Sequence, residues 1–190
     1  MKEQIKMILF VVVLGIVAAS IIVGSQNYTF DKIVDNKESK LKSTILEAFE
    51  IDSTEDTVTQ VYNKSIREEV KGGTTFYYSE EGNIGFEIIG KGLWGPITGF
   101  MTLEPDLMTI KAIQIISNEE TPGLGGVIAE QWYIDKYKGK KFDPEIVIKK
   151  GADMTSETEV DSITGATMTS NAFQLMLNEN YQKQKEVLDK

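Results

Sequence analysis

The feature that most constrains this chain is a long apolar run near its beginning. Residues 7–24 (MILFVVVLGIVAASIIVG) contain no charged side chain. As a helix rising about 1.5 Å per residue, the run would span about 27 Å, close to the thickness of the hydrocarbon core of a lipid bilayer. Lys2 and Lys6 precede it, and positively charged flanks stay in the cytoplasm. We therefore expect a single-pass helix in the cell (inner) membrane, with a cytoplasmic N-terminus and an extracytoplasmic domain.

Two other interpretations of this run compete with a membrane anchor. A cleaved signal peptide would have a shorter apolar segment, and no A-x-A-like cleavage site closes the run. A buried core helix would be unusual, because the segment is apolar on every face. A retained anchor fits these observations best.

The residue types that are missing narrow the chemistry. The chain has no Cys and no His, which excludes disulfides, thiolate nucleophiles and metal sites built on these ligands. We expect no metal site, so redox or hydrolytic chemistry must come from carboxylates, hydroxyls or an organic cofactor. The net charge is -9 and the single arginine is Arg67, so the chain lacks the basic surface that binding to nucleic acid requires.

Beyond the apolar run, the pattern predicts an α+β fold with a mostly antiparallel sheet and flanking helices. A polar connector at 25–29 leads to an amphipathic helix at 31–49. Runs rich in β-branched and aromatic residues, separated by short turns, predict strands at 57–62, 74–78, 84–89, 97–103 and 109–116. Helices are expected at 127–137 and 168–188, with a short strand at 145–148. The expected parts are an anchor (1–24), a connector with the amphipathic helix (25–56) and a folded domain (57–190).

The first of three unusual segments precedes the last predicted helix. Residues 161–167 read DSITGAT, and Gly165 and Ala166 leave room for a large group to approach the Thr167 hydroxyl. The free N–H groups of a helix N-terminus would stabilise a phosphate there. The alternative is a simple N-cap, in which Thr164 or Thr167 caps the helix.

The other two segments combine glycines with a rigid or aromatic residue. In residues 120–126 (ETPGLGG), Pro122 favours a turn and the glycines allow close approach to a flat ring; the alternative is a plain loop before the helix. In residues 90–97 (GKGLWGPI), Trp94 stands between glycines and offers a face for stacking. The alternative there is a structural tryptophan on a β-turn.

Together, the three segments resemble the FMN-binding domains of the Rnf and Nqr respiratory complexes. Residues 161–167 fit the flavinylation motif D-x-x-[ST]-G-A-[ST], and the family has the same ETPGLG loop and a similar G-x-G-L-W-G-x-I stretch. The resemblance implies that Thr167 carries FMN through a phosphoester bond, which a flavin transferase makes from FAD. It implies that the cofactor-binding residues of a domain at 57–190 also include Asp161, Thr164, Gly165, Ala166, Glu120, Thr121, Gly123, Leu124, Gly125, Leu93 and Trp94. The family often has a His before the second segment, where this chain has Ser-Asn-Glu at 117–119.

Within this resemblance, the compact length favours the G subunit of an Rnf ion-translocating ferredoxin:NAD+ oxidoreductase. That interpretation implies an electron-transfer subunit with no complete catalytic site of its own, whose partners are the lipid bilayer and other membrane and redox subunits. The coupling ion would be Na+ or H+. The alternatives are the C subunit of a Na+-translocating NADH:quinone reductase, a stand-alone extracytoplasmic flavoprotein, or a membrane-anchored binding or sensory module without covalent cofactor. Nicotinamide binding is not expected, because no G-x-G-x-x-G follows a strand and opens a helix.

Overall fold

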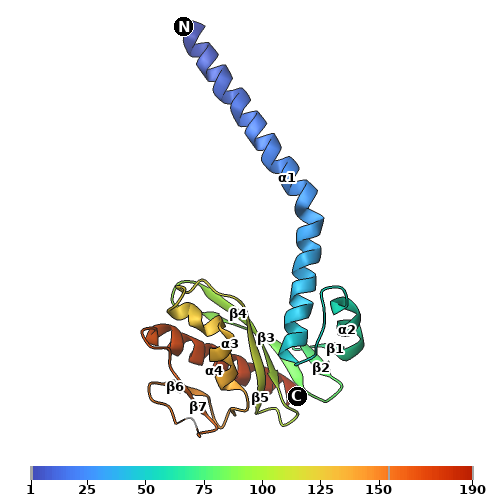
Figure 1. Cartoon of the computed structure of the whole chain (residues 1–190), viewed down its shortest axis with the longest axis vertical. Helices are drawn as coiled ribbons and strands as arrows, with labels where there is room; N and C mark the ends of the chain where they lie inside the picture. The colour runs from blue at the N-terminus through green and yellow to red at the C-terminus, as the bar shows by residue number, and fades with distance from the viewer. Residues whose placement is uncertain (1, 154, 190) are drawn as a thin grey trace. The chain divides into compact units, whose positions relative to one another are not determined.

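The computed structural model describes residues 2–153 and 155–189 and divides the chain into two compact units, Met1–Lys40 and Leu41–Lys190 (Figure 1). Helix α1 (Lys2–Ala48) contains the apolar run. Its part Lys2–Phe30 is long and apolar enough to cross a membrane, by length and composition. The segment 25–29, expected as a connector, is helical instead. It contains no helix-breaking pair of glycines or prolines, and the Thr29 hydroxyl donates to the Ser25 carbonyl at 2.9 Å, a bond compatible with a helix interior.

The centre of the second unit is a five-stranded sheet. Strands β1 (Ile66–Lys71), β2 (Thr74–Ser79), β3 (Ile84–Lys91), β4 (Pro96–Leu103) and β5 (Ile110–Ser117) lie in sequence order. Every neighbouring pair is antiparallel, which confirms the α+β prediction with its antiparallel sheet. Gly72 and Gly73 make the first turn with positive φ angles of 56° and 82°, a conformation that favours glycine.

Two local expectations for this unit were wrong, and one strand was missed. The strand expected at 57–62 is helix α2 (Val58–Ser65), because its buried residues Val58 and Tyr62 are four positions apart and share one helix face. The helix expected at 127–137 is broken into η1 (Gly125–Ala129), α3 (Gln131–Ile134) and η2 (Asp135–Tyr137). The charged strand β1 was not foreseen, because Ile66 is the one buried residue among its six and four of the others are charged.

The last third of the chain forms a small sheet and a long helix. Strands β6 (Val147–Lys149) and β7 (Glu159–Asp161) pair in parallel, and β7 was not predicted. Helix α4 (Thr167–Leu188) starts one residue before its predicted position. The Oε1 atom of Gln174 on α4 accepts from the Ile148 N–H of β6 at 2.6 Å, which ties the small sheet to the helix.

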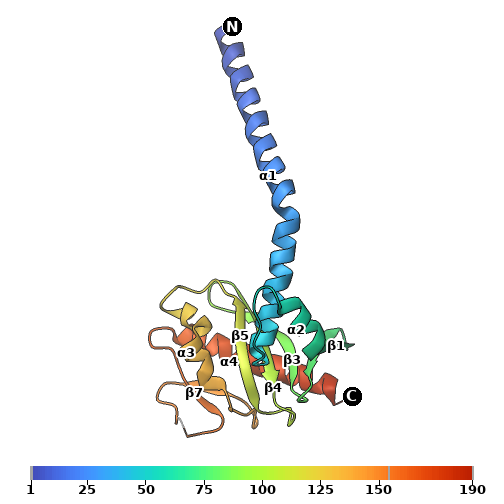
Figure 2. The ribbon, with the colours of Figure 1, turned by 45° about the vertical axis from the view of Figure 1, so that its right-hand side comes forward.

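Helices cover both faces of the large sheet (Figure 2). On one face, α4 packs against β3 and buries Phe173, Leu177 and Tyr181 with Phe86 and other strand residues. On the other face, α2 and residues 45–49 bury a second cluster. This second cluster consists of Ile45, Leu46, Ala48, Phe49, Val58, Tyr62, Ile66 and Phe100. Because both faces are buried, the turns and loops at the ends of the strands are left to carry exposed functional side chains.

Candidate functional site

The segment around Trp94 forms the turn between β3 and β4. The Gly92 N–H donates to the Gly95 carbonyl at 2.8 Å and closes the turn. Trp94 keeps 69% of its surface exposed, and its neighbour Leu93 is also exposed. An indole in this position does not fill the core. A structural tryptophan would be expected to stabilise the fold through burial, and Trp94 has little of it.

The segment 120–126 forms the end of the loop after β5 and the first two residues of η1. The Thr121 carbonyl accepts from the N–H groups of Leu124 at 3.1 Å and Gly126 at 2.9 Å, which folds the loop back on itself. Gly123 has a φ of 73°, in the left-handed region that glycine adopts without steric cost. Leu124 at the loop tip is 46% exposed. The loop therefore presents an apolar side chain and bare backbone to the surface.

The segment 161–167 leads from β7 into α4. The Ala166 N–H donates to the Ile163 carbonyl at 3.1 Å, and Gly165 has a φ of 81°. Ala166 occupies the N-cap position, and no side-chain hydrogen bond caps the helix there. This helix end is therefore not capped by the side chain of Thr164 or Thr167. Thr167 is exposed in the first turn of α4, where helix N–H groups are free to bind an anion.

The carboxylate of Glu120 joins these three segments. Its Oε1 accepts from the Leu93 N–H at 2.6 Å and from the Trp94 N–H at 3.1 Å. Its Oε2 accepts from the Thr169 hydroxyl at 2.7 Å, two residues after Thr167. Glu120 is only 6% exposed. The turn that carries Trp94, the glycine-rich loop and the start of α4 therefore meet around one buried carboxylate.

Two glycines leave room for this carboxylate. A Cβ atom at Gly92 would collide with Glu120 Oε1, and one at Gly125 would lie 2.5 Å from Glu120 Oε2 and 2.6 Å from Thr169 Oγ1. The loop and the α4 entry also touch directly, since a Cβ at Gly165 would lie 3.4 Å from Leu124 Cδ2. These contacts explain physically why glycines recur in segments that are far apart in the sequence.

Ser170 is a residue of this site that the sequence reasoning missed. It is buried, its Oγ accepts from the Ile163 N–H at 3.1 Å, and it donates to the Ala166 carbonyl at 3.0 Å. These two bonds fix the turn that presents Thr167. The signal was present in the spacing: Ser170 lies three residues after Thr167, one turn further along the predicted helix.

Two tyrosines lie beneath this helix end. The Tyr137 hydroxyl donates to the Tyr133 hydroxyl at 3.1 Å, and both rings are buried. Burial raises the pKa of Tyr133, although its hydrogen bonds with Tyr137 and Ser170 act in the opposite direction. Burial likewise holds the pKa of Tyr137 well above its usual range. Both phenols therefore stay neutral and support the first turn of α4 without adding charge.

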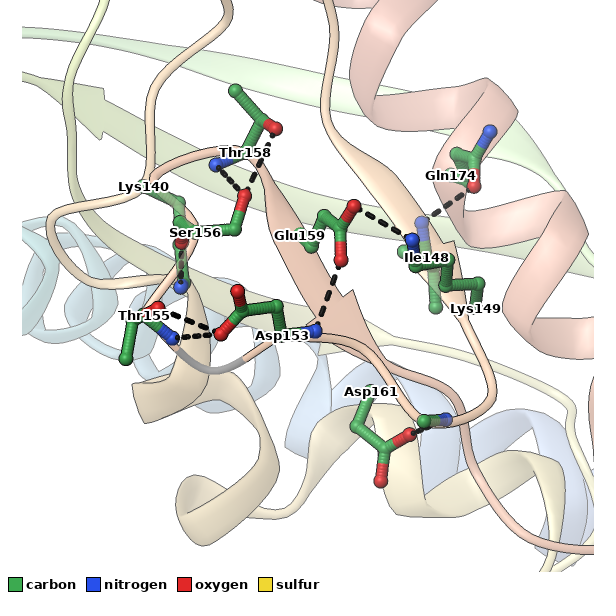
Figure 3. Close-up of polar contacts among 11 residues, drawn as sticks. Lys140, Ile148, Lys149, Asp153, Thr155, Ser156, Thr158, Glu159, Asp161 and Gln174 are labelled. Atoms are coloured by element: carbon green, nitrogen blue, oxygen red, sulfur yellow. Dashed lines mark hydrogen bonds and ion pairs between the residues drawn. The ribbon is translucent and has the colours of Figure 1, made fainter.

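Asp161 lies apart from the Glu120 cluster. Its Oδ1 accepts from the Gly151 N–H at 2.9 Å, on the loop that follows β6 (Figure 3). Nearby, Glu159 pairs with Lys149 at 2.6 Å and accepts from the Asp153 N–H at 2.9 Å. In this arrangement the Asp161 side chain links β7, the strand that leads to Thr164, to the loop after β6.

A protein-family model matches the part of the chain that holds segments 120–126 and 161–167 and most of segment 90–97. Residues 92–182 match the model of the FMN-binding domain. The match supports FMN as the cofactor of this region. It begins at the turn that carries Trp94 and includes Glu120 and Thr167.

Curated relatives share this region. The C subunit of the Na(+)-translocating NADH-quinone reductase of Vibrio alginolyticus is 43% identical over 91 residues, which are 45% of this chain and 36% of that protein. The corresponding protein of Neisseria meningitidis serogroup A is 40% identical over 103 residues, which are 50% of this chain and 40% of that protein. The chain thus matches well under half of the length of these relatives.

Solved structures show the same fold. The crystal structure of the C subunit of the Na(+)-translocating NADH-quinone reductase from Parabacteroides distasonis has a TM-score of 0.68 at 23% identity. The match covers 80% of this chain and 92% of that chain. The structure of NqrC from Shewanella oneidensis has a TM-score of 0.69 at 19% identity, covering 77% and 93%. The α+β architecture described above is therefore a known one.

The assignment to the G subunit of an Rnf complex is wrong. It rested on the compact length of the chain, whereas the relatives that share its sequence carry the name of the C subunit of the NADH-quinone reductase. Length could not discriminate, because the shared region covers only 36% and 40% of these relatives, and the rest of each chain decides its length.

Proposed function

We propose that this chain is a C-type subunit of a Na+-translocating NADH:quinone reductase and carries electrons on FMN attached to Thr167. Identities of 40–43% to such subunits across the FMN-binding region support this assignment. The chain would act as one redox subunit of the complex, with further membrane and redox subunits as partners. When bound, FMN supplies the one-electron chemistry, which a chain without Cys or His cannot perform by itself.

The observation that carries the proposal is the meeting of the three segments around Glu120. It brings the exposed Thr167 hydroxyl, at a helix end without a side-chain cap, onto the same part of the surface as Trp94 and Leu124. The helix N–H groups would stabilise a phosphate, and the exposed indole offers a stacking face to a flat ring. A Cβ at Gly123 would meet nothing within 4 Å, so this part of the loop is open to a bound group. The residues present therefore fit FMN.

Attachment requires a partner enzyme in this proposal. The Thr167 oxygen would attack the FMN phosphorus of FAD, the phosphoanhydride bond would break, and AMP would leave while the hydroxyl proton passes to a base of the enzyme or to water. A flavin transferase would supply the activation, because the chain shows no nucleotide-hydrolysing motif. A covalent link keeps the cofactor on a domain that lies outside the cytoplasm, where lost FMN could not be replaced.

The apolar part of α1 supports a membrane location. We propose that Lys2–Phe30 spans the lipid bilayer with Lys2 and Lys6 on the cytoplasmic side and the FMN-binding domain on the other. Protease added to spheroplasts should then digest the domain, and partner subunits of the complex would reduce that digestion.

The test is covalent loading of the full chain, co-expressed with a flavin transferase. Wild type should give a fluorescent band under ultraviolet light after denaturing electrophoresis, and Thr167→Val should give none because it lacks the attacking hydroxyl. Ser162→Ala is the matched control, since it removes a hydroxyl at a position that the motif leaves unspecified and should stay fluorescent. Sequencing the labelled peptide must place FMN on residue 167. A wild-type band without fluorescence would contradict the proposal and favour a module without covalent cofactor.

A further inference from the structure

Glu120 is a buried acidic group whose hydrogen-bond partners are all neutral. Its two oxygens accept hydrogen bonds from two backbone N–H groups and one hydroxyl. Within residues 2–153 and 155–189, none of the ion pairs includes it. Removing a carboxylate from water is costly, and dipolar donors offset only part of that cost. Burying the Glu120 carboxylate therefore costs free energy that a loop with only a connecting role would not require.

The geometry shows what the carboxylate holds in place. Oε1 fixes the backbone of Leu93 and Trp94 at the tip of the β3–β4 turn, and Oε2 fixes Thr169 in the first turn of α4. The Glu120 N–H in turn donates to the Asn118 side chain at 3.1 Å, which steadies the loop itself. Both oxygens are engaged by the chain's own donors. Glu120 therefore acts on a bound group through other residues and through its charge.

We infer that Glu120 is a positioning residue with a second effect: it aligns the Trp94 turn with the start of α4, and its negative charge lowers the reduction potential of the flavin. The electrostatic part rests on the proposed function. Reduction adds negative charge to the flavin, and a nearby carboxylate that is shielded from water disfavours that change. The positioning part depends only on the protein and is testable without flavin.

The neighbouring residue Glu119 provides a matched control. It is exposed, and its side chain lies beside Gly95 of the same turn. The two residues have the same charge and adjacent positions in the loop, but water and salt screen the exposed one. Neutralising Glu119 should therefore affect the flavin much less than neutralising Glu120.

The electrostatic experiment compares midpoint potentials of the FMN-loaded full chain in detergent. Glu120→Gln keeps the shape of the side chain and removes its charge. Its amide oxygen can still accept from the Leu93 and Trp94 N–H groups, while its NH2 group donates to the Thr169 hydroxyl, which donates to Glu120 in the wild type. In the FMN-loaded protein this variant should shift the one-electron equilibrium toward reduced flavin by about tenfold, equivalent to about 59 mV. Glu119→Gln should shift it by less than a third of that amount. Equal potentials in wild type and Glu120→Gln, or equal shifts in the two variants, would overturn the electrostatic assignment.

The positioning experiment measures amide hydrogen exchange of the full chain without flavin. In Glu120→Ala, the Leu93 and Trp94 amides lose their acceptor and should exchange at least tenfold faster, whereas Glu120→Gln should stay close to wild type. Unchanged protection in Glu120→Ala would overturn the positioning role. If Glu120→Ala does not fold, Glu120→Asp decides, because it keeps the charge but shortens the side chain by one methylene group: faster exchange of the Leu93 and Trp94 amides than in wild type supports the positioning role, and unchanged exchange overturns it. A wild type that takes up no FMN would refute the proposed function while leaving the exchange result valid.

Discussion

Gly125→Ala tests whether the Glu120 cluster has the tight packing described above. The added methyl group would lie 2.5 Å from Glu120 Oε2 and 2.6 Å from Thr169 Oγ1, far inside van der Waals contact. Gly125 is not among the residues with positive φ, so alanine fits its backbone conformation. The cost must therefore come from the collision with the hydrogen-bonded pair.

The magnitude follows from the cheapest way to relieve the collision. The Glu120 side chain would swing away and give up its bonds to Leu93, Trp94 and Thr169. The two backbone N–H groups lie at an exposed turn and can bond to water, which limits their loss. The Thr169 hydroxyl is buried, and leaving it without an acceptor costs about 1–3 kcal/mol. We expect Gly125→Ala to lower the free energy of unfolding by about 3 kcal/mol once residual overpacking is included.

Gly123→Ala is the control for this prediction. Its Cβ would meet nothing within 4 Å, but its φ of 73° makes alanine unfavourable by about 1 kcal/mol. Urea unfolding of the full chain in detergent, followed by near-ultraviolet circular dichroism of the buried tyrosines, measures both variants. In a Glu120→Ala background the cost of Gly125→Ala should fall by at least about 1 kcal/mol, because the two residues are coupled. A Gly125→Ala variant no less stable than Gly123→Ala would refute the reasoning.

Two further predictions concern the exposed indole and a surface ion pair. Trp94→Ala should leave FMN loading at Thr167 intact and shift the flavin midpoint potential by tens of millivolts, because 1 kcal/mol corresponds to about 40 mV for one electron. Redox titration measures this shift, and an unchanged potential would show that the ring binds elsewhere. The hydrogen bond from Lys138 holds the pKa of Glu50 below its ordinary value, so the pair stabilises the fold above about pH 4.3 and ceases to do so as the pH falls through the lowered value. Glu50→Gln should therefore be less stable than wild type in urea at pH 7, and the difference should disappear once the pH falls below the lowered pKa of Glu50. Equal stability at pH 7 would contradict this.

Local patterns in the sequence were sufficient for several features. The apolar run at 7–24 lies in a helix. Runs of β-branched and aromatic residues separated by short turns predicted an antiparallel sheet, and the strands of that sheet lie in sequence order. Both signals depend on residues that are close in the chain, so no tertiary information is needed to read them. The sequence also singled out the three segments that meet at the surface, because each combines glycines with a hydroxyl, a proline or an indole and together they resemble the motifs of a known family.

Other features depended on burial, which a single sequence does not display. Residues 57–62 are β-branched enough for a strand, yet Val58 and Tyr62 pack against Phe100 and the end of α1 as a helix. The segment 25–29 is polar and still helical, since no residue there prevents the helix from continuing. Local propensities are weak, and tertiary contacts override them.

The candidate site shows most clearly what the sequence predicts and what only the tertiary structure decides. The sequence alone predicted which residues could hold a phosphate and a flat ring, because hydroxyl, glycine and indole chemistry belongs to the residue types. Only the tertiary structure decided that one carboxylate, Glu120, holds the Trp94 turn and the start of α4 together, that Ser170 fixes the turn before Thr167, and that Asp161 lies elsewhere. Glu120 and Thr169 are 49 residues apart in the chain, and the hydrogen bond between them exists only because the sheet and α4 bring them to 2.7 Å.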